Sequence, residues 1–223
     1  MNREELAEAA GLVRSITDLL LTVPVDATTP EAAQLRSVCG TVDADAEADL
    51  RGHTFAGPLA SCFAAVAAAG ADADALARVL MTIAQRPTTS TLADIVSTLA
   101  VRLALAYQCK AIAVMEIISR DQADALVSRV RTAFDTAIDK AVDNSESDVF
   151  KDLSALSAAV VRDLSDRGRK QPQTVTYAVN QRRPSLALAQ ILYADPSRAD
   201  ELARNNGVIH PLFMPASGTA LVF

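Results

Sequence analysis

Apolar residues recur every three or four positions over most of the chain, which is the spacing that predicts amphipathic α-helices. The longest pattern begins at Ser90 and continues to about Ile117, with apolar residues on more than one face, so we expect this helix to be central. Pro and Gly separate the periodic segments, and the connections are short. Short connections between successive helices predict antiparallel neighbours in a helical bundle.

Polar residues mark where several of these helices should begin. Asn2 with Glu5 three residues later has the pattern of a capping box, in which each side chain binds the other residue's backbone N–H. Pro30 favours another helix start, and we expect a short helix that ends near Val38. The acidic stretch 43–49 that follows is interpreted as a solvated helix face, because it lacks the pattern of a calcium loop.

The pattern changes after residue 166. A polar linker over 167–173 contains Gly and Pro, and short runs of strand and helix type follow it. The sequence therefore predicts a mostly α protein, with a helical bundle followed by a small βααβ module at the C-terminal end. The expected segments are a bundle over 1–166 with a sub-boundary near 87–90, and within the module (174–223) a strand at 174–179, helices at 185–193 and 195–206, and a strand at 219–223.

Composition agrees with close-packed helices and disfavours a nucleic-acid partner. Half of the 223 residues are apolar, few are aromatic and none is Trp. The net charge is −6, and the excess of acidic residues lies before residue 145. Residues 145–223 carry nine basic and eight acidic residues. This near balance does not predict the strongly basic face that neutralises the phosphates of a nucleic acid.

Neither the cysteines nor the apolar segments predict an unusual environment. The cysteines are far apart and odd in number, which is typical of buried thiols in a reducing compartment. They are Cys39, Cys62 and Cys109. The most apolar window, 92–118, contains four charged residues, so we expect no membrane span. The first residues lack the basic and apolar pattern of a signal peptide.

The sequence indicates no catalytic site. It contains no nucleophile elbow, zinc-protease, phosphate-loop or dinucleotide motif. Its two histidines, His53 and His210, are isolated from each other. The neighbouring carboxylates Asp200 and Glu201 lie among arginines, where solvated ion pairs are the expected role. We therefore expect no enzyme activity, no cofactor and no metal.

The order strand–helix–helix–strand in about fifty residues resembles a LysM module, in which two helices pack on one face of a two-stranded antiparallel sheet. The resemblance lies in the pattern of elements, from Tyr177 in the first strand to Met214-Pro215 before the last. It is incomplete, because Gln181-Arg182-Arg183-Pro184 replaces the Gly-Asp pair that usually follows the first strand.

A more specific resemblance covers about residues 145–223. These residues are similar to the C-terminal end of the "DNA circularisation" proteins of Mu-like contractile-tailed phages. Ala194 stands where those proteins usually have Gly. The matching motifs, in order, are PSLALA (184–189), LYAD (192–195), RADEL (198–202), RN (204–205) and HPLFMP (210–215).

The resemblance implies a structural component of a contractile phage tail or phage-derived particle, which acts in baseplate or hub assembly by protein–protein docking. Its expected partners are hub, tube or tape-measure proteins and further copies of itself, and its expected location is the virion, after assembly in the host cytoplasm. The candidate contact surface is formed by two loops of the module, 181–185 and 207–218. Its interaction residues are Arg182, Arg183, His210, Phe213 and Met214, with core packing as the competing role of the last two.

Two other functions are consistent with these features. The LysM-like plan favours a peptidoglycan-binding module of a virion. The family label, together with the basic linker residues Arg167, Arg169 and Lys170, suggests a DNA-binding or circularisation accessory protein.

Overall fold

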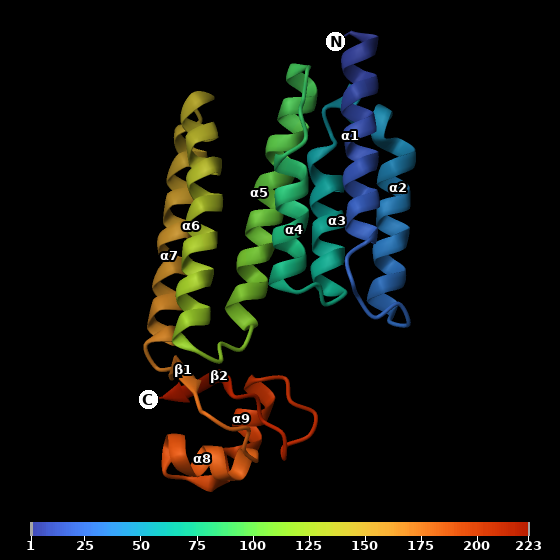
Figure 1. The fold of residues 1–223 in the computed structure, drawn as a ribbon. Coiled ribbons are helices and arrows are strands. Elements are labelled where there is room, and N and C mark those ends of the chain that lie inside the picture. Colours follow the sequence, from blue (N-terminus) through green and yellow to red (C-terminus); the bar gives the residue numbers. More distant parts are fainter. Residues whose placement is uncertain (1, 223) are drawn as a thin grey trace. The chain divides into compact units, whose positions relative to one another are not determined.

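The computed structural model describes residues 2–222 and is mostly helical, with a small antiparallel sheet of two strands near the C-terminal end (Figure 1). The helical class predicted from the sequence is therefore confirmed. The elements of the helical part are α1 (Arg3–Leu21), α2 (Pro30–Gly52), α3 (Ala56–Ala68), α4 (Ala73–Ala84), α5 (Thr91–Val114), α6 (Arg120–Asp143) and α7 (Ser147–Gly168). The remaining elements are β1 (Gln173–Ala178), α8 (Ser185–Tyr193), the 3₁₀ turn η1 (Pro196–Arg198), α9 (Ala199–Asn205) and β2 (Ser217–Val222).

Side-chain caps start α1 and α5 where the sequence predicted them. The Asn2 side chain accepts a hydrogen bond from the first turn of α1, and the Glu5 carboxylate accepts one from the Asn2 backbone N–H, so the capping box is confirmed. Ser90 caps α5 through the backbone N–H of Ala93. These bonds satisfy donors that the first turn of a helix leaves unpaired.

The prediction of a short second helix is wrong, because α2 continues to Gly52. Its buried stripe keeps helical spacing beyond Val38, through Cys39, Val42, Ala46 and Leu50. The acidic residues between these positions lie on the solvent side of α2, as predicted for a solvated helix face. The next residue, His53, caps the end of the helix in the left-handed conformation, with φ 57°.

The chain divides into two compact units. One contains residues 1–115 and 131–160, and the other contains residues 116–130 and 161–223. The division passes through the α6–α7 hairpin, so the second unit holds the sheet and its helices together with the adjoining ends of α6 and α7. The sequence placed the linker between bundle and module at 167–173, whereas the last turn of α7 reaches Gly168.

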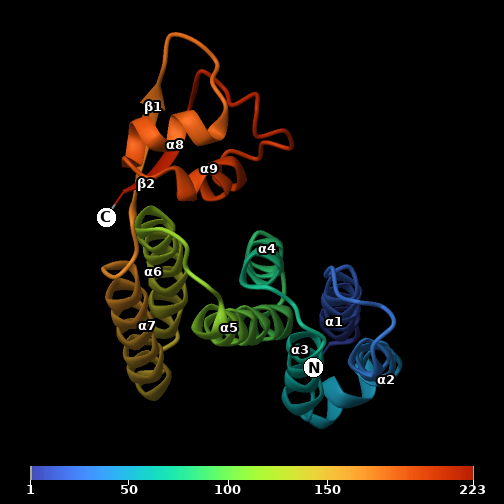
Figure 2. The same ribbon diagram turned by 90° about the horizontal axis from the view of Figure 1, so that it is seen from below.

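Within the first unit, α5 is the helix on which others pack. It contacts α1, α3 and α4, and α2 packs against α1 and α3 (Figure 1, Figure 2). Two ion pairs join α5 to the hairpin within this unit. Asp94 lies 2.9 Å from the Nζ of Lys140, and Arg102 pairs with Glu146.

By length and composition, α5 is the one helix among residues 2–222 that could cross a membrane, with a mean hydropathy of 1.3. Central helices of water-soluble bundles have the same composition. Here the buried face of α5 includes Val96, Leu105 and Ile112, and it packs against three neighbouring helices.

The C-terminal module is built around the pairing of β1 with β2. Gln173 lies opposite Val222 and Ala178 lies opposite Ser217, in antiparallel register. Its core combines both strands, both helices and one loop residue, and Leu188, Leu202 and Met214 are fully buried there. The members of this core are Tyr177, Leu188, Ala189, Ala199, Leu202, Ala203, Met214 and Ala220.

Side chains from the helices cover the outer edge of β2. The Asn206 amide accepts a bond from the N–H of Thr219 and donates one to its C=O, both at 2.8 Å. The Tyr193 hydroxyl accepts a bond from the N–H of Leu221, and Arg198 donates one to its C=O. Four backbone groups that an edge strand would leave open are thus satisfied.

Candidate protein-interaction surface

The two loops proposed from the sequence lie side by side in the module. The N–H of Ser185, at the start of α8, donates to the C=O of Pro211 at 2.6 Å. The N–H of Met214 donates to the C=O of Arg183 at 3.2 Å. These two backbone bonds join residues 183–185 to residues 211–214 and fix the conformation of both loops.

Met214 anchors the second loop rather than facing outward. Its side chain is fully buried in the module core, so its assignment as an interaction residue is corrected to a core role. Phe213, the preceding residue, is 68% exposed. The loop therefore buries Met214 while the neighbouring Phe213 faces solvent.

Three large apolar side chains of this loop are exposed together. Ile209 is 89% exposed and Leu212 is 66% exposed, in addition to Phe213. Large apolar side chains exposed close together in one loop are typical of binding surfaces. We call the following residues the loop surface: Arg182, Arg183, Ile209, His210, Leu212 and Phe213.

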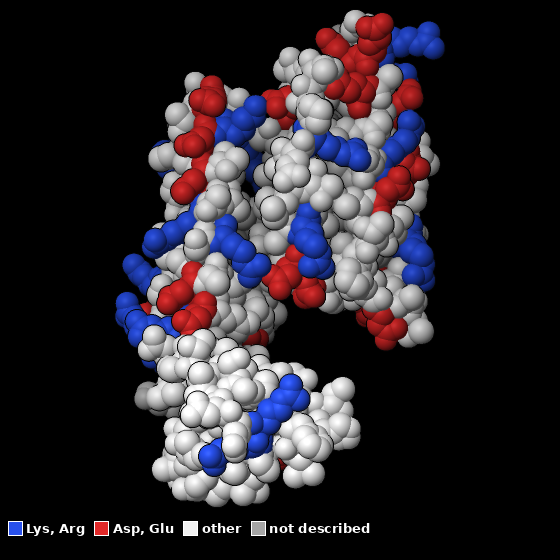
Figure 3. Space-filling view, viewed as in Figure 1, with Lys and Arg blue, Asp and Glu red and all other residues white. Residues whose placement is uncertain are grey.

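The polar members of the loop surface are also solvent-exposed. Arg182 and Arg183 lie in the first loop and His210 lies in the second. The C=O of His210 accepts a bond from the N–H of Phe213 at 3.0 Å, which closes a tight turn. The visible face of the module is largely uncharged and carries a few basic side chains (Figure 3). This surface is suited to binding a partner through apolar contacts with arginines beside them.

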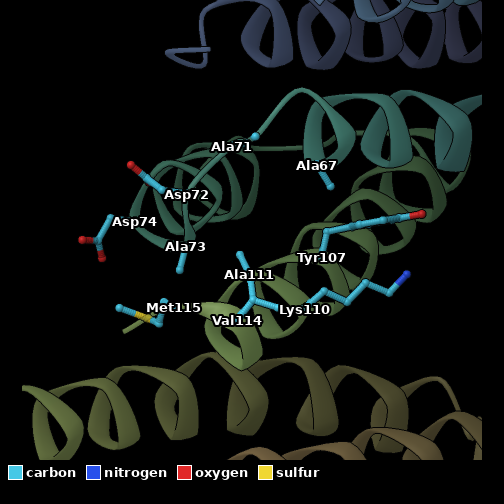
Figure 4. Close-up of a pocket in the computed structure, with 11 residues that line it drawn as sticks. Ala67, Ala71, Asp72, Ala73, Asp74, Tyr107, Lys110, Ala111, Val114 and Met115 are labelled. Atoms are coloured by element: carbon cyan, nitrogen blue, oxygen red, sulfur yellow. The ribbon is translucent and has the colours of Figure 1, made fainter. Parts of the chain in front are cut away.

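The first unit contains a hollow of 460 Å³ between the α3–α4 connection and the end of α5 (Figure 4). Its walls are mostly apolar, and the Nζ of Lys110 lies 4.4 Å from the centre of the Tyr107 ring. Asp72, at its edge, caps α4 through the N–H of Ala75. Asp72 and Lys110 therefore each make a contact within the chain that stabilises the fold.

A second hollow, of 770 Å³, lies within the second unit and has a mixed charged lining. Of its basic residues, Arg198 pairs with Glu201 and Arg167 pairs with Asp163 at 3.0 Å. The pairing of Arg198 raises its pKa, chiefly through the hydrogen bond to the Glu201 carboxylate. These bases are thus engaged with neighbouring carboxylates of the same chain.

Within residues 2–222, no group of three or more His, Cys, Asp or Glu side chains has the arrangement of a metal site. The three cysteines are buried and form no disulfide, in keeping with the buried role predicted for them. Burial raises the pKa of the Cys109 thiol to about 11, so this thiol is protonated at neutral pH.

No family model and no curated protein matches this chain. Sequence reasoning named the two loops that backbone hydrogen bonds join in the structure, but it did not name their exposed apolar residues Ile209 and Leu212. A sign was available, because each lies in a short apolar run outside any periodic pattern, on either side of His210-Pro211. What sequence alone could not supply was the direction of each side chain.

Proposed function

We propose that this protein is a structural component of a contractile phage tail or phage-derived particle, and that it acts by docking rather than by catalysis. The observation that carries this proposal is the loop surface, where three large apolar side chains stand in solvent on a fixed backbone. Its partner in this proposal is another tail or baseplate protein, such as a hub, tube or tape-measure protein.

The composition of the loop surface supports a protein partner. Phe213 and the arginines Arg182 and Arg183 belong to the residue types that most often anchor protein interfaces. A preformed loop also loses little conformational entropy on binding, because backbone bonds already hold it. A rigid apolar contact of this kind suits a particle that must assemble once and stay assembled.

The backbone at Ala194 supports the family resemblance on which the phage context rests. This residue ends α8 in the left-handed conformation, with φ 57°. The similar phage proteins usually have Gly at this position, and Gly adopts that conformation without steric cost. The backbone at position 194 therefore has the left-handed conformation that Gly, the usual residue in the similar proteins, would favour.

The proposal is tested with tail particles sedimented from cells that produce this protein with its own phage or phage-derived element. We expect the chain to co-sediment, and we expect Phe213→Ala to reduce the bound fraction about tenfold, as loss of an aromatic anchor does. The matched control is Ile191→Ala, which removes a side chain that is 54% exposed on α8 outside the loop surface.

Two results would overturn the proposal. One is absence of the wild-type chain from the particles, and the other is equal binding by the Phe213 and Ile191 variants. Co-sedimentation of the wild-type chain with purified peptidoglycan, with no binding to particles, would instead favour the glycan-binding function that the LysM-like plan suggests.

A further inference from the structure

The two edges of the small sheet differ in how their backbone groups are satisfied. On β2, the outward groups of Thr219 and Leu221 are bonded to side chains from the helices. The outer edge of β1 has one such bond, from the N–H of Thr174 to the Asp121 carboxylate at 2.7 Å. The edge of β2 is therefore closed at Thr219 and Leu221, whereas most of the edge of β1 is open.

The register identifies the open groups. In an antiparallel pair, opposite residues alternate between exchanging two backbone bonds and exchanging none. The N–H of Val179 donates to the C=O of Ala216 at 2.7 Å, so Tyr177 with Gly218, two residues further into the sheet, is also a bonded pair. The alternate residues, Thr176 and Ala178, must direct their backbone groups away from β2.

These groups are accessible and unsatisfied in the described chain. Thr176 and Ala178 are both exposed, and no hydrogen bond to their N–H or C=O occurs within residues 2–222. Native edge strands are usually blocked by a charged side chain, a proline or a covering segment. Residues 171–181 contain no charged residue, and their proline, Pro172, precedes the strand.

We propose that the edge of β1 at Thr176 and Ala178 binds an extended segment of another protein, which adds to the sheet as a third strand. Alternating backbone donors and acceptors along an open edge are complementary to another β-strand. Four backbone bonds become available at these two residues. Beside them, Val175 is 46% exposed and gives the added strand an apolar contact.

Charge identifies the kind of segment that fits. Exposed basic residues lie on both sides of the uncharged strand, with Lys170 before it, next to Arg169 (paired with Asp166 at 3.4 Å), and with Arg182 and Arg183 after it. Two copies of this chain paired antiparallel along β1 would bring like charges together at both ends. A segment with acidic residues at its ends and β-branched residues between them avoids this repulsion and complements the edge.

The test uses the full chain labelled with ¹⁵N and a blocked peptide of sequence Glu-Thr-Val-Thr-Val-Thr-Glu. At a saturating peptide concentration, we expect the amide hydrogen exchange of Thr176 and Ala178 to slow about tenfold, because both amides become bonded. Replacing the terminal Glu residues by Lys should weaken binding. Unchanged exchange of both amides at millimolar peptide would overturn the proposal.

A pair of variants separates backbone from side-chain effects. Thr176→Pro removes an outward N–H and leaves the bonds of Val175 and Tyr177 to β2 in place, so we expect peptide affinity to fall about tenfold or more. Thr176→Ala keeps the N–H and should bind within about twofold of the wild type. Equal affinity of the two variants would refute strand addition, provided that the Tyr177 amide stays protected in both.

This inference is independent of the docking function proposed above. Phe213→Ala changes the loop surface and leaves the β1 edge intact, so it should bind the peptide as the wild type does. Failure of the chain to bind tail particles would therefore leave the peptide result unaffected, and failure of the peptide to bind would leave the particle result unaffected.

Discussion

Replacing Asn206 by Ala should strongly destabilise the C-terminal module. The Asn206 side chain makes three hydrogen bonds of 2.8 Å, one to the C=O of Leu202 in α9 and two to the backbone of Thr219 in β2. Each such bond contributes about 1 kcal/mol net, and its loss leaves partly buried backbone groups unpaired. We expect a loss of about 2–3 kcal/mol in the free energy of unfolding of the module.

Tyrosine fluorescence can report this unfolding, because the chain has three tyrosines and no Trp. Two of them, Tyr177 and Tyr193, lie in the module, and the variant Tyr107→Phe removes the third. In this background, the urea midpoint of the module should fall by about 2–3 M, for a denaturant slope of about 1 kcal/mol/M.

The matched control is Asn205→Ala. Asn205 is the exposed last residue of α9, and its side chain makes no hydrogen bond within the described chain. If the stabilities of the Asn206 and Asn205 variants differ by less than about 0.5 kcal/mol, the bonds to β2 do not hold the module together and the reasoning fails.

Two further predictions concern the ends of helices in the second unit. Ala194→Gly should raise the stability of the module by about 1 kcal/mol, because Gly adopts the left-handed conformation without the steric cost that Ala bears; an unchanged or lower urea midpoint would contradict this. The bond from the N–H of Thr174 lowers the pKa of Asp121 below its ordinary value of 3.8. A carboxylate whose pKa is lowered in the folded state stabilises the fold at pH values above its unfolded pKa. This stabilisation is lost as the pH falls through the folded pKa. The Thr174 amide should therefore lose its protection from hydrogen exchange only below about pH 4. The variant Asp121→Asn should show no such transition, and a transition of the same midpoint in both proteins would exclude Asp121 as its source.

Much of the helical part could be predicted from the sequence, because its signals are local. A capping side chain lies two or three residues from the N–H it satisfies, so Asn2 and Ser90 were identified without tertiary information. The end of α9 is another local case, since Gly207 follows it with φ 62°, a conformation that Gly adopts without steric cost. The end of α2 was missed because small and acidic residues obscure its apolar stripe, and burial of Ala46 and Leu50 depends on neighbouring helices.

The candidate sites depended on tertiary structure to a greater degree. The sequence by itself determined the order strand–helix–helix–strand and which loops contain Arg182 and Phe213. Only the packed module decided that Met214 enters the core while Phe213 faces solvent, because that choice depends on the space left between α8, α9 and the sheet. The open edge of β1 is also a tertiary property, since the side chains that close β2 come from residues 13 to 28 positions away in the chain.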